Sequence, residues 1–148
     1  MTMVNLALYQ PDIALNVGAG MRLCACLGIR LDIIEPCGFP WDQRKIRQSA
    51  MDYMDHLDLK RHISYESFIM AYPGRRIVLL TTKTQTSYTN FEYTENDILL
   101  AGRESAGVPV DIYQGSHAQV GIKMRGTARS LNVINACAMV LGEALRQT

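Results

Sequence analysis

The sequence predicts an α/β fold: a mostly parallel sheet with helices on both faces. Short apolar runs rich in β-branched residues recur along the chain, and helix-like segments lie between them. No internal repeat, low-complexity tract or linker marks a boundary. A chain of 148 residues can bury roughly 68–70% of its unfolded surface. We therefore expect residues 1–148 to form one domain.

The elements follow from these patterns. Five apolar runs, each followed by turn signals, predict strands at residues 4–9, 31–34, 77–81, 97–101 and 119–124. Segments with helical character predict helices at residues 17–27, 41–51, 65–72 and 131–146. This alternation is typical of parallel strands joined by helical crossovers.

Composition narrows the class. A hydrophobic fraction of 48% and a charged fraction of 20% are typical of a globular protein, and a net charge of +1 gives no long-range field to attract an anionic partner. The four cysteines form no CxxC pair and have no histidine at ligand spacing, so we expect reduced thiols and no metal site. The start lacks signal-peptide character, and the longest uncharged helical stretch, 131–142, is shorter than the roughly 20 residues of a membrane span. We expect a cytoplasmic protein without a membrane partner.

The last predicted helix has two apolar stripes. Ile134, Ala138 and Leu141 lie on one stripe, and Val140 and Ala144 lie on another. One stripe should meet the sheet. The other indicates either a homodimer or further burial within the monomer.

The first predicted helix begins with two glycines after a strand. Gly18 and Gly20 resemble part of a dinucleotide-binding loop, and Glu35 stands near the usual place of a ribose-binding acid, but Leu23 occupies the position of the third glycine. Alternatively, the glycines serve tight helix packing, Asn16 caps the helix, and Arg22 is solvated or pairs with phosphate.

A second segment, residues 100–109, follows the strand at 97–101. Gly102 and Gly107 flank Glu104 at a strand end, where α/β sheets bind ligands. The alternative is structural: the glycines permit turn dihedrals, and Glu104 caps a helix or pairs with an arginine.

A third segment, residues 122–135, leads into the last helix. Ser130 can cap a helix that starts at Leu131, and Asn132 and Asn135 can bond the backbone of its first turn. Capping does not explain Arg129. A cation beside the unpaired N–H groups of a helix N-terminus suits a phosphate.

A fourth segment, residues 38–53, joins an aromatic loop to a basic helix. Trp41, Arg44 and Arg47 suit an unstacked base and an RNA backbone, although a basic helix can be merely solvated. Residues 60–62 and the pair Arg75 and Arg76 are weaker basic clusters with the same alternative.

Taken in order, these segments resemble the SPOUT superfamily of RNA methyltransferases, and within it the small tRNA wobble-position 2′-O-methyltransferases. The resemblance covers nearly the whole chain. Its most specific parts are NVGAGMRLCACLG from Asn16, IIEPCGFPWDQRKIRQSAMDY from Ile33, LLTTK from Leu79, GRESAGVP from Gly102 and IKMRGTARSLNVINA from Ile122.

The resemblance implies a sheet whose C-terminal part is threaded into a deep trefoil knot, an exception to the rule against threaded chains. It also implies a homodimer, with the site near the subunit interface, and S-adenosylmethionine as methyl donor in the knot loops. By motif match, the donor would contact Leu80, Thr81, Gly102, Ile122, Met124, Ser130 and Leu131.

For chemistry, the resemblance implies methyl transfer to the 2′-hydroxyl of a tRNA ribose, at nucleotide 34 of the anticodon. It assigns Arg22 to the substrate hydroxyl or its phosphate, and it assigns orienting or supporting roles to Asn16, Glu104, Ser130 and Asn132. RNA would meet Arg22, Trp41, Arg44, Arg47 and Arg129. A guanidinium stays protonated, so the proton acceptor is left unassigned.

Three alternatives stay open at this point. The first is a related enzyme that modifies another tRNA or rRNA ribose. The second is a dinucleotide-binding module that uses Gly18 and Gly20, and the third is a catalytically silent RNA-binding protein.

Overall fold

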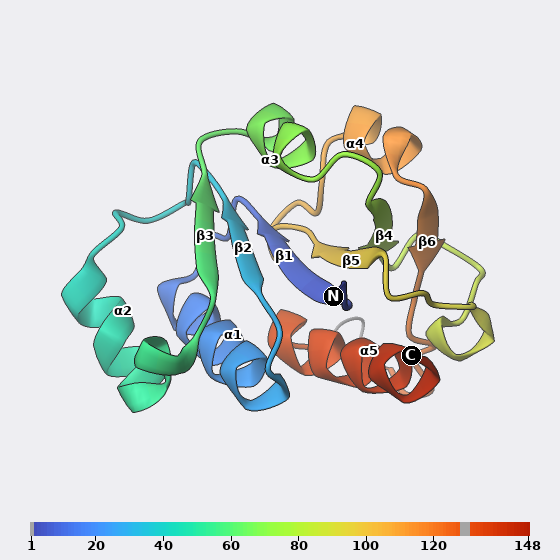
Figure 1. Cartoon of the computed structure of the whole chain (residues 1–148). Helices are drawn as coiled ribbons and strands as arrows, with labels where there is room; N and C mark the ends of the chain where they lie inside the picture. Colours follow the sequence, from blue (N-terminus) through green and yellow to red (C-terminus); the bar gives the residue numbers. More distant parts are fainter. Residues whose placement is uncertain (1, 128–130) are drawn as a thin grey trace.

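The computed structural model describes residues 2–127 and 131–148, which contain one six-stranded sheet (Figure 1). Its order is β3-β2-β1-β5-β4-β6, and every pairing is parallel. The carboxyl ends of the strands therefore share one edge of the sheet. The strands are β1 (Asn5–Tyr9), β2 (Leu31–Ile34), β3 (Leu59–His62), β4 (Arg76–Leu80), β5 (Asp97–Ala101) and β6 (Ala118–Val120).

Helices cover both faces of this sheet. In Figure 1, α1 (Ala14–Leu27), α2 (Gln43–Ala50) and α5 (Val133–Gln147) lie on one side, and α3 (Tyr65–Ala71) and α4 (Val110–Gly115) lie on the other. Two short 3-10 helices, η1 (Met51–His56) and η2 (Tyr88–Asn90), complete the chain.

The core has two halves because successive side chains of a strand point to opposite faces. In β1, Leu6 and Leu8 pack into the cluster that contains Met21 of α1, whereas Ala7 and Tyr9 pack with Phe68 of α3. All five residues of β1 are buried, and after Asn5 the strand is a continuous apolar run rather than an alternating one.

The predicted class is confirmed: the fold is α/β with a parallel sheet and helices on both faces. The predicted strands at 31–34 and 97–101 match β2 and β5, that at 4–9 begins one residue before β1, and that at 77–81 is shifted by one residue from β4. Each of the four predicted helices is present, with shifted ends.

Three element predictions were wrong or missing. The predicted strand at 119–124 ends at Val120, because Gly121 turns away to bond the loop after β4. The prediction missed β3, an edge strand in which Lys60 and Arg61 are exposed, and it missed the short helix α4.

The second apolar stripe of the last helix is largely used within the chain. Val140 and Ala144 are buried together with Ile134, Cys137 and Leu141. This burial supports the monomer alternative for the stripe. Met139, by contrast, is 41% exposed.

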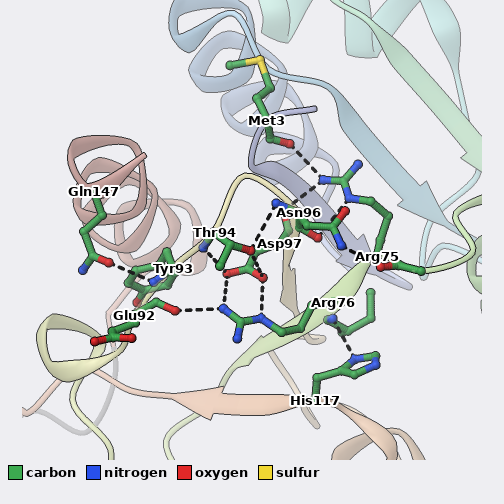
Figure 2. A network of polar contacts seen from close by, with 12 residues as sticks. Met3, Arg75, Arg76, Glu92, Tyr93, Thr94, Asn96, Asp97, His117 and Gln147 are labelled. Carbon is green, nitrogen blue, oxygen red and sulfur yellow. Dashed lines mark hydrogen bonds and ion pairs between the residues drawn. The ribbon is translucent and has the colours of Figure 1, made fainter. Parts of the chain in front are cut away.

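The amino edge of β4 and β5 is closed by a polar network (Figure 2). The Asp97 carboxylate, 1% exposed, accepts hydrogen bonds from Arg76 Nε at 2.6 Å and Nη2 at 2.8 Å, and from the Thr94 N–H at 2.9 Å. This bidentate pairing raises the pKa of Arg76.

A second arginine completes the network. Arg75 donates to the carbonyls of Met3, Asn96 and Asp97 (Figure 2). Arg75 and Arg76 thus hold the amino ends of β4 and β5 together, a structural role that differs both from the predicted RNA contact and from simple solvation. The opposite, carboxyl edge of the sheet is where a ligand can enter.

Candidate active site

A pocket of about 940 Å³ lies at the carboxyl edge of the sheet. Its size falls within the range of small-molecule sites. Three loops and the start of α5 form its walls. The pocket includes the predicted donor contacts Leu80, Thr81, Gly102, Ile122, Met124 and Leu131, together with Glu104 and Asn132.

The loop after β5 is closed on itself by glycine packing. Arg103 and Gly107 exchange backbone hydrogen bonds of 3.0 and 2.8 Å, and Gly107 has a φ of 63°. A Cβ at Gly102 would lie 2.7 Å from the Gly107 carbonyl carbon. The turn dihedral expected for Gly107 is therefore confirmed, whereas Gly102 is required by the close approach rather than by its dihedrals, and the turn itself is a wall of the pocket.

A glycine that the sequence reasoning missed joins the other two loops. A Cβ at Gly121 would lie 2.8 Å from the Thr81 carbonyl oxygen, so only glycine permits this approach. The Gly121 N–H donates to Thr86, and its carbonyl accepts from Tyr88. The segments after β4 and β6 are thereby held in contact at the pocket.

The polar groups that the sequence predicted as supporting residues form one chain of contacts. Asn16 Nδ2 donates to Glu104 Oε1, and Asn132 Nδ2 donates to Asn16 Oδ1 at 3.0 Å. Asn132 Oδ1 accepts from the N–H groups of Ile134 and Asn135 at 2.9 and 3.2 Å. The structure therefore brings Asn16, Glu104 and Asn132 together beside Gly102.

These contacts correct two capping predictions. Asn132, rather than Ser130, caps the last helix, which begins at Val133 and not at Leu131. Asn16 lies inside α1, whose N-cap is Ile13. Glu104 accepts a hydrogen bond from Asn16, and within residues 2–127 and 131–148 it neither caps a helix nor pairs with an arginine. The predicted site residues Arg129 and Ser130 lie outside the described residues.

Asp12, which the sequence reasoning did not single out, also belongs to this edge. Its carboxylate accepts from the Glu104 N–H at 3.3 Å, the Ser105 N–H at 3.2 Å and the Ser105 hydroxyl at 2.6 Å. Partial burial opposes ionisation, but these hydrogen bonds outweigh it and lower the pKa of Asp12. A carboxylate just after a strand end was the available signal.

The glycines of α1 serve packing. A Cβ at Gly18 would lie 2.4 Å from Ser49 Cβ of α2, and a Cβ at Gly20 would lie 3.4 Å from Ile134 Cδ1. Both glycines are buried within a helix rather than in an open loop, and Glu35 pairs with Arg61. The dinucleotide-binding alternative was therefore wrong, and the packing alternative is correct.

Four of the predicted RNA-binding residues, Arg22, Trp41, Arg44 and Arg47, are described by the structure and do not line the pocket of their own chain. The Arg22 guanidinium lies 5.3 Å from the centre of the Tyr53 ring, on a different face of α1 from Asn16. Trp41 stacks with Arg61 at 4.2 Å, and Arg47 pairs with Asp55. Arg44 is exposed on α2, which Asp42 caps through the N–H groups of Arg44 and Lys45.

One known protein family matches nearly the whole chain. The model of the SpoU rRNA Methylase family matches residues 3–142. The chain belongs to this family. The match covers the sheet, the pocket loops and most of α5.

Similar proteins span the same length as this SpoU chain. The tRNA (cytidine(34)-2'-O)-methyltransferase of Beijerinckia indica subsp. indica is 54% identical over 144 residues, covering 96% of this chain and 90% of that protein. A solved structure on the 2-OH methylation of C/U34 on tRNA is 36% identical, with a TM-score of 0.92, covering 99% of this chain and 96% of that one.

A further solved structure carries the donor. An AdoMet-bound rRNA methyltransferase from Sinorhizobium meliloti is 25% identical with a TM-score of 0.86, and the match covers 97% of this chain and 56% of that chain.

In the part of the present chain that the structure describes, no helix is long and apolar enough to cross a bilayer.

Proposed function

We propose that this SpoU protein transfers a methyl group from S-adenosylmethionine to the ribose 2′-hydroxyl of nucleotide 34 in a tRNA anticodon. The observation that carries the proposal is the pocket at the carboxyl edge, bordered by the contacts among Glu104, Asn16 and Asn132. The relatives named for cytidine-34 methylation, which match nearly end to end, support the choice of substrate. Such a tRNA substrate fits an enzyme of the cytoplasm.

The pocket suits the donor chemically. Apolar side chains of Leu80, Ile122 and Leu131 provide walls for an adenine ring and for the methylene groups of the donor, and the close turn at Gly102 presents backbone groups to polar atoms. When bound, the donor supplies an electrophilic methyl group on a sulfonium. Ser130 would complete the third loop.

The chain's own residues supply positioning for an in-line displacement. The ribose oxygen forms the new bond to carbon, the sulfur–carbon bond breaks with its electron pair going to sulfur, and the hydroxyl proton passes to a base. Alignment of these atoms supplies much of the rate. Glu104 is held through Asn16, and Asn16 through Asn132, so each polar group has a fixed orientation.

We assign Arg22 to the substrate hydroxyl or phosphate, reaching the site from a second copy of the chain. Arg22 points toward Tyr53 and does not line the pocket of its own chain as the structure describes it. A homodimer whose interface is formed by the starts of α1 and α5 would bring Arg22 of one copy to the pocket of the other. The exposed Ile13 and Leu15 lie at the start of α1 and the exposed Leu131 lies just before α5, whereas the exposed Met139 lies farther along α5; Leu15 is 73% exposed.

We also propose that the pocket loops form the deep trefoil knot of the SPOUT fold. The contact of Gly121 with Thr81, and the pairing of Ser87 with Gly121, support a crossing of the segments after β4 and β6. In the same proposal, the RNA-contacting residues are Trp41, Arg44, Arg47 and Arg129, which would meet the anticodon arm through aromatic and basic side chains.

The direct test is transfer of labelled methyl from S-adenosylmethionine to total tRNA, followed by mass mapping of the methylated ribose. We expect modification at nucleotide 34. Methylation only of another tRNA position or of rRNA would contradict the proposed target, and absence of ribose methylation would contradict the reaction.

The assignment of Arg22 is tested by mixing two inactive variants. Arg22→Ala and Asn132→Ala should each lose activity, and an equal mixture that re-pairs at random should recover about a quarter of wild-type activity, since half of its dimers are mixed and each mixed dimer has one complete site of two. No recovery in verified mixed dimers would show that Arg22 acts within its own chain.

A further inference from the structure

Asp12 lies between two loops of the site. It precedes α1, and its carboxylate accepts two successive backbone N–H groups and one hydroxyl from Glu104 and Ser105. Successive N–H groups around one anion form a nest, an arrangement that fixes both the anion and the backbone. The nest therefore ties the backbone of Glu104 to the loop after β1.

Asp12 is also held from the opposite side. The Gly38 N–H donates to the Pro11 carbonyl at 2.9 Å, and a Cβ at Gly38 would lie 2.9 Å from both Cα and Cβ of Asp12. The loop after β2 thus packs directly against the Asp12 backbone. The Asp12 backbone therefore cannot move away from Glu104 without displacing the loop after β2.

The loop that Asp12 holds keeps its shape by other means. Arg103 and Gly107 close it with two backbone hydrogen bonds, and Arg103 Nε donates to the Gly107 carbonyl at 3.0 Å. Glu104 and Ser105 form the exposed tip. The bonds to Asp12 therefore set the direction of this tip relative to α1, rather than the existence of the loop.

We propose that Asp12 is a positioning residue that orients Glu104 toward Asn16 by binding the backbone of Glu104 and Ser105. The inference rests on the proposed function, because Glu104 matters through the methyl-transfer site. Asp12 does not touch the reacting atoms. It acts through Glu104, and a displacement of about 1 Å at such a group can cost about a hundredfold in rate.

The experiment compares Asp12→Asn, Asp12→Glu and Ser105→Ala with the wild type. Asp12→Asn keeps the size of the side chain but replaces one acceptor with a donor that faces N–H groups. We expect its kcat on tRNA to fall about ten- to a hundredfold, with KM for tRNA and Kd for S-adenosylmethionine within about threefold. Ser105→Ala should lose less, because two of the three hydrogen bonds to Asp12 remain, and Asp12→Glu should also lose rate, because its longer side chain displaces the tip.

Two measurements separate positioning from general damage. Rates are divided by the number of donor-binding sites from calorimetry, and Tm is recorded for each variant. Asp58→Asn is the matched control, because Asp58 is an exposed carboxylate just before β3, at the amino edge of the sheet. We expect this control to keep the wild-type kcat.

An NMR measurement that does not depend on enzyme activity completes the test. The side-chain amide signals of Asn16, assigned by NMR with the help of Asn16→Ser, should shift in Asp12→Asn and stay in place in Asp58→Asn. Unchanged signals, or a wild-type kcat per binding site in Asp12→Asn, would overturn the inference. A wild type that does not methylate tRNA would instead contradict the proposed function, and the amide signals would still test the role of Asp12.

Discussion

Asn132 performs two tasks with one side chain. Its oxygen caps α5 through the N–H groups of Ile134 and Asn135, and its nitrogen donates to Asn16. Both polar atoms are therefore engaged. Helix stability and the order of the site depend on the same amide.

Two substitutions separate these tasks. Asn132→Ala should lose the cap, at a cost of about 1 kcal/mol in the free energy of unfolding, and should also lose methyl transfer. Asn132→Asp should keep the cap, because a carboxylate is favourable at a helix N-terminus, yet still lose the donor to Asn16. Urea unfolding and methyl-transfer assays measure both effects.

Asn135→Asp is the matched control for this pair. It makes the same chemical change in the first turn of α5, and Asn135 is exposed. It should leave methyl transfer near the wild-type rate. An active Asn132→Asp enzyme would show that the bond to Asn16 is dispensable.

The close contact at Gly121 leads to a prediction about the affinity for S-adenosylmethionine. In Gly121→Ala the new methyl group would meet the Thr81 carbonyl oxygen at 2.8 Å, so the segments after β4 and β6 must separate. We expect Kd for S-adenosylmethionine, measured by calorimetry, to rise about tenfold, which corresponds to about 1.4 kcal/mol of binding free energy. Gly115→Ala, whose Cβ meets nothing within 4 Å, should bind like the wild type.

At the scale of elements, α1 and α2 pack through a glycine. A Cβ at Gly18 would lie 2.4 Å from Ser49 Cβ, closer than side chains allow. Gly18→Ala should therefore lower the free energy of unfolding by about 1–3 kcal/mol. Guanidinium unfolding gives this value.

The double variant Gly18→Ala with Ser49→Gly tests the cause. It adds a Cβ at residue 18 of α1 and removes the Ser49 side chain that this Cβ would meet in α2. Part of the lost free energy of unfolding should therefore return, despite the cost of a glycine within α2. Purely additive effects of the two changes would argue against a direct contact.

Element prediction succeeded where a segment's own pattern decides its structure. The runs that became β2 and β5 are short, apolar and bounded by turn signals, and both faces of each are buried. The strand β3 was missed because Lys60 and Arg61 follow the pattern of an exposed edge, which resembles a solvated charge cluster.

The site was partly predictable. Asn16, Glu104 and Asn132 stood out as polar groups in loops and at helix starts, and the structure brings them together. The sequence could not choose between Ser130 and Asn132 as the cap, because both residue types cap well and contact with Asn16 favours one of them. Asp12 gave no signal beyond its place after a strand, since its partners lie more than 90 residues away.

At the scale of the whole molecule, the four thiols are shielded to different degrees. Cys24 and Cys137 are buried between the sheet and its helices, which raises the pKa of both thiols, that of Cys137 to about 12. Burial, aided by Glu35, raises the pKa of Cys37 to about 11. Cys26 is exposed on α1.

Thiol labelling at pH 8 should follow this order. The thiolate is the reactive form, so a thiol whose pKa is raised stays protonated and reacts slowly. We expect iodoacetamide to modify Cys26 first and Cys37 next, with Cys24 and Cys137 protected, as followed by peptide mass spectrometry. All four should react in denaturant, and early labelling of Cys137 in the folded protein would contradict the burial described above.

The way the pocket is assembled has a kinetic consequence. Its walls come from segments after β4, β5 and β6, and the bond between Asn16 and Asn132 joins residues 116 positions apart. Contacts between such distant segments form late, because a large loop must close first. During refolding, β1, α1 and β2 can associate early, whereas the capacity to capture a ligand should be acquired last.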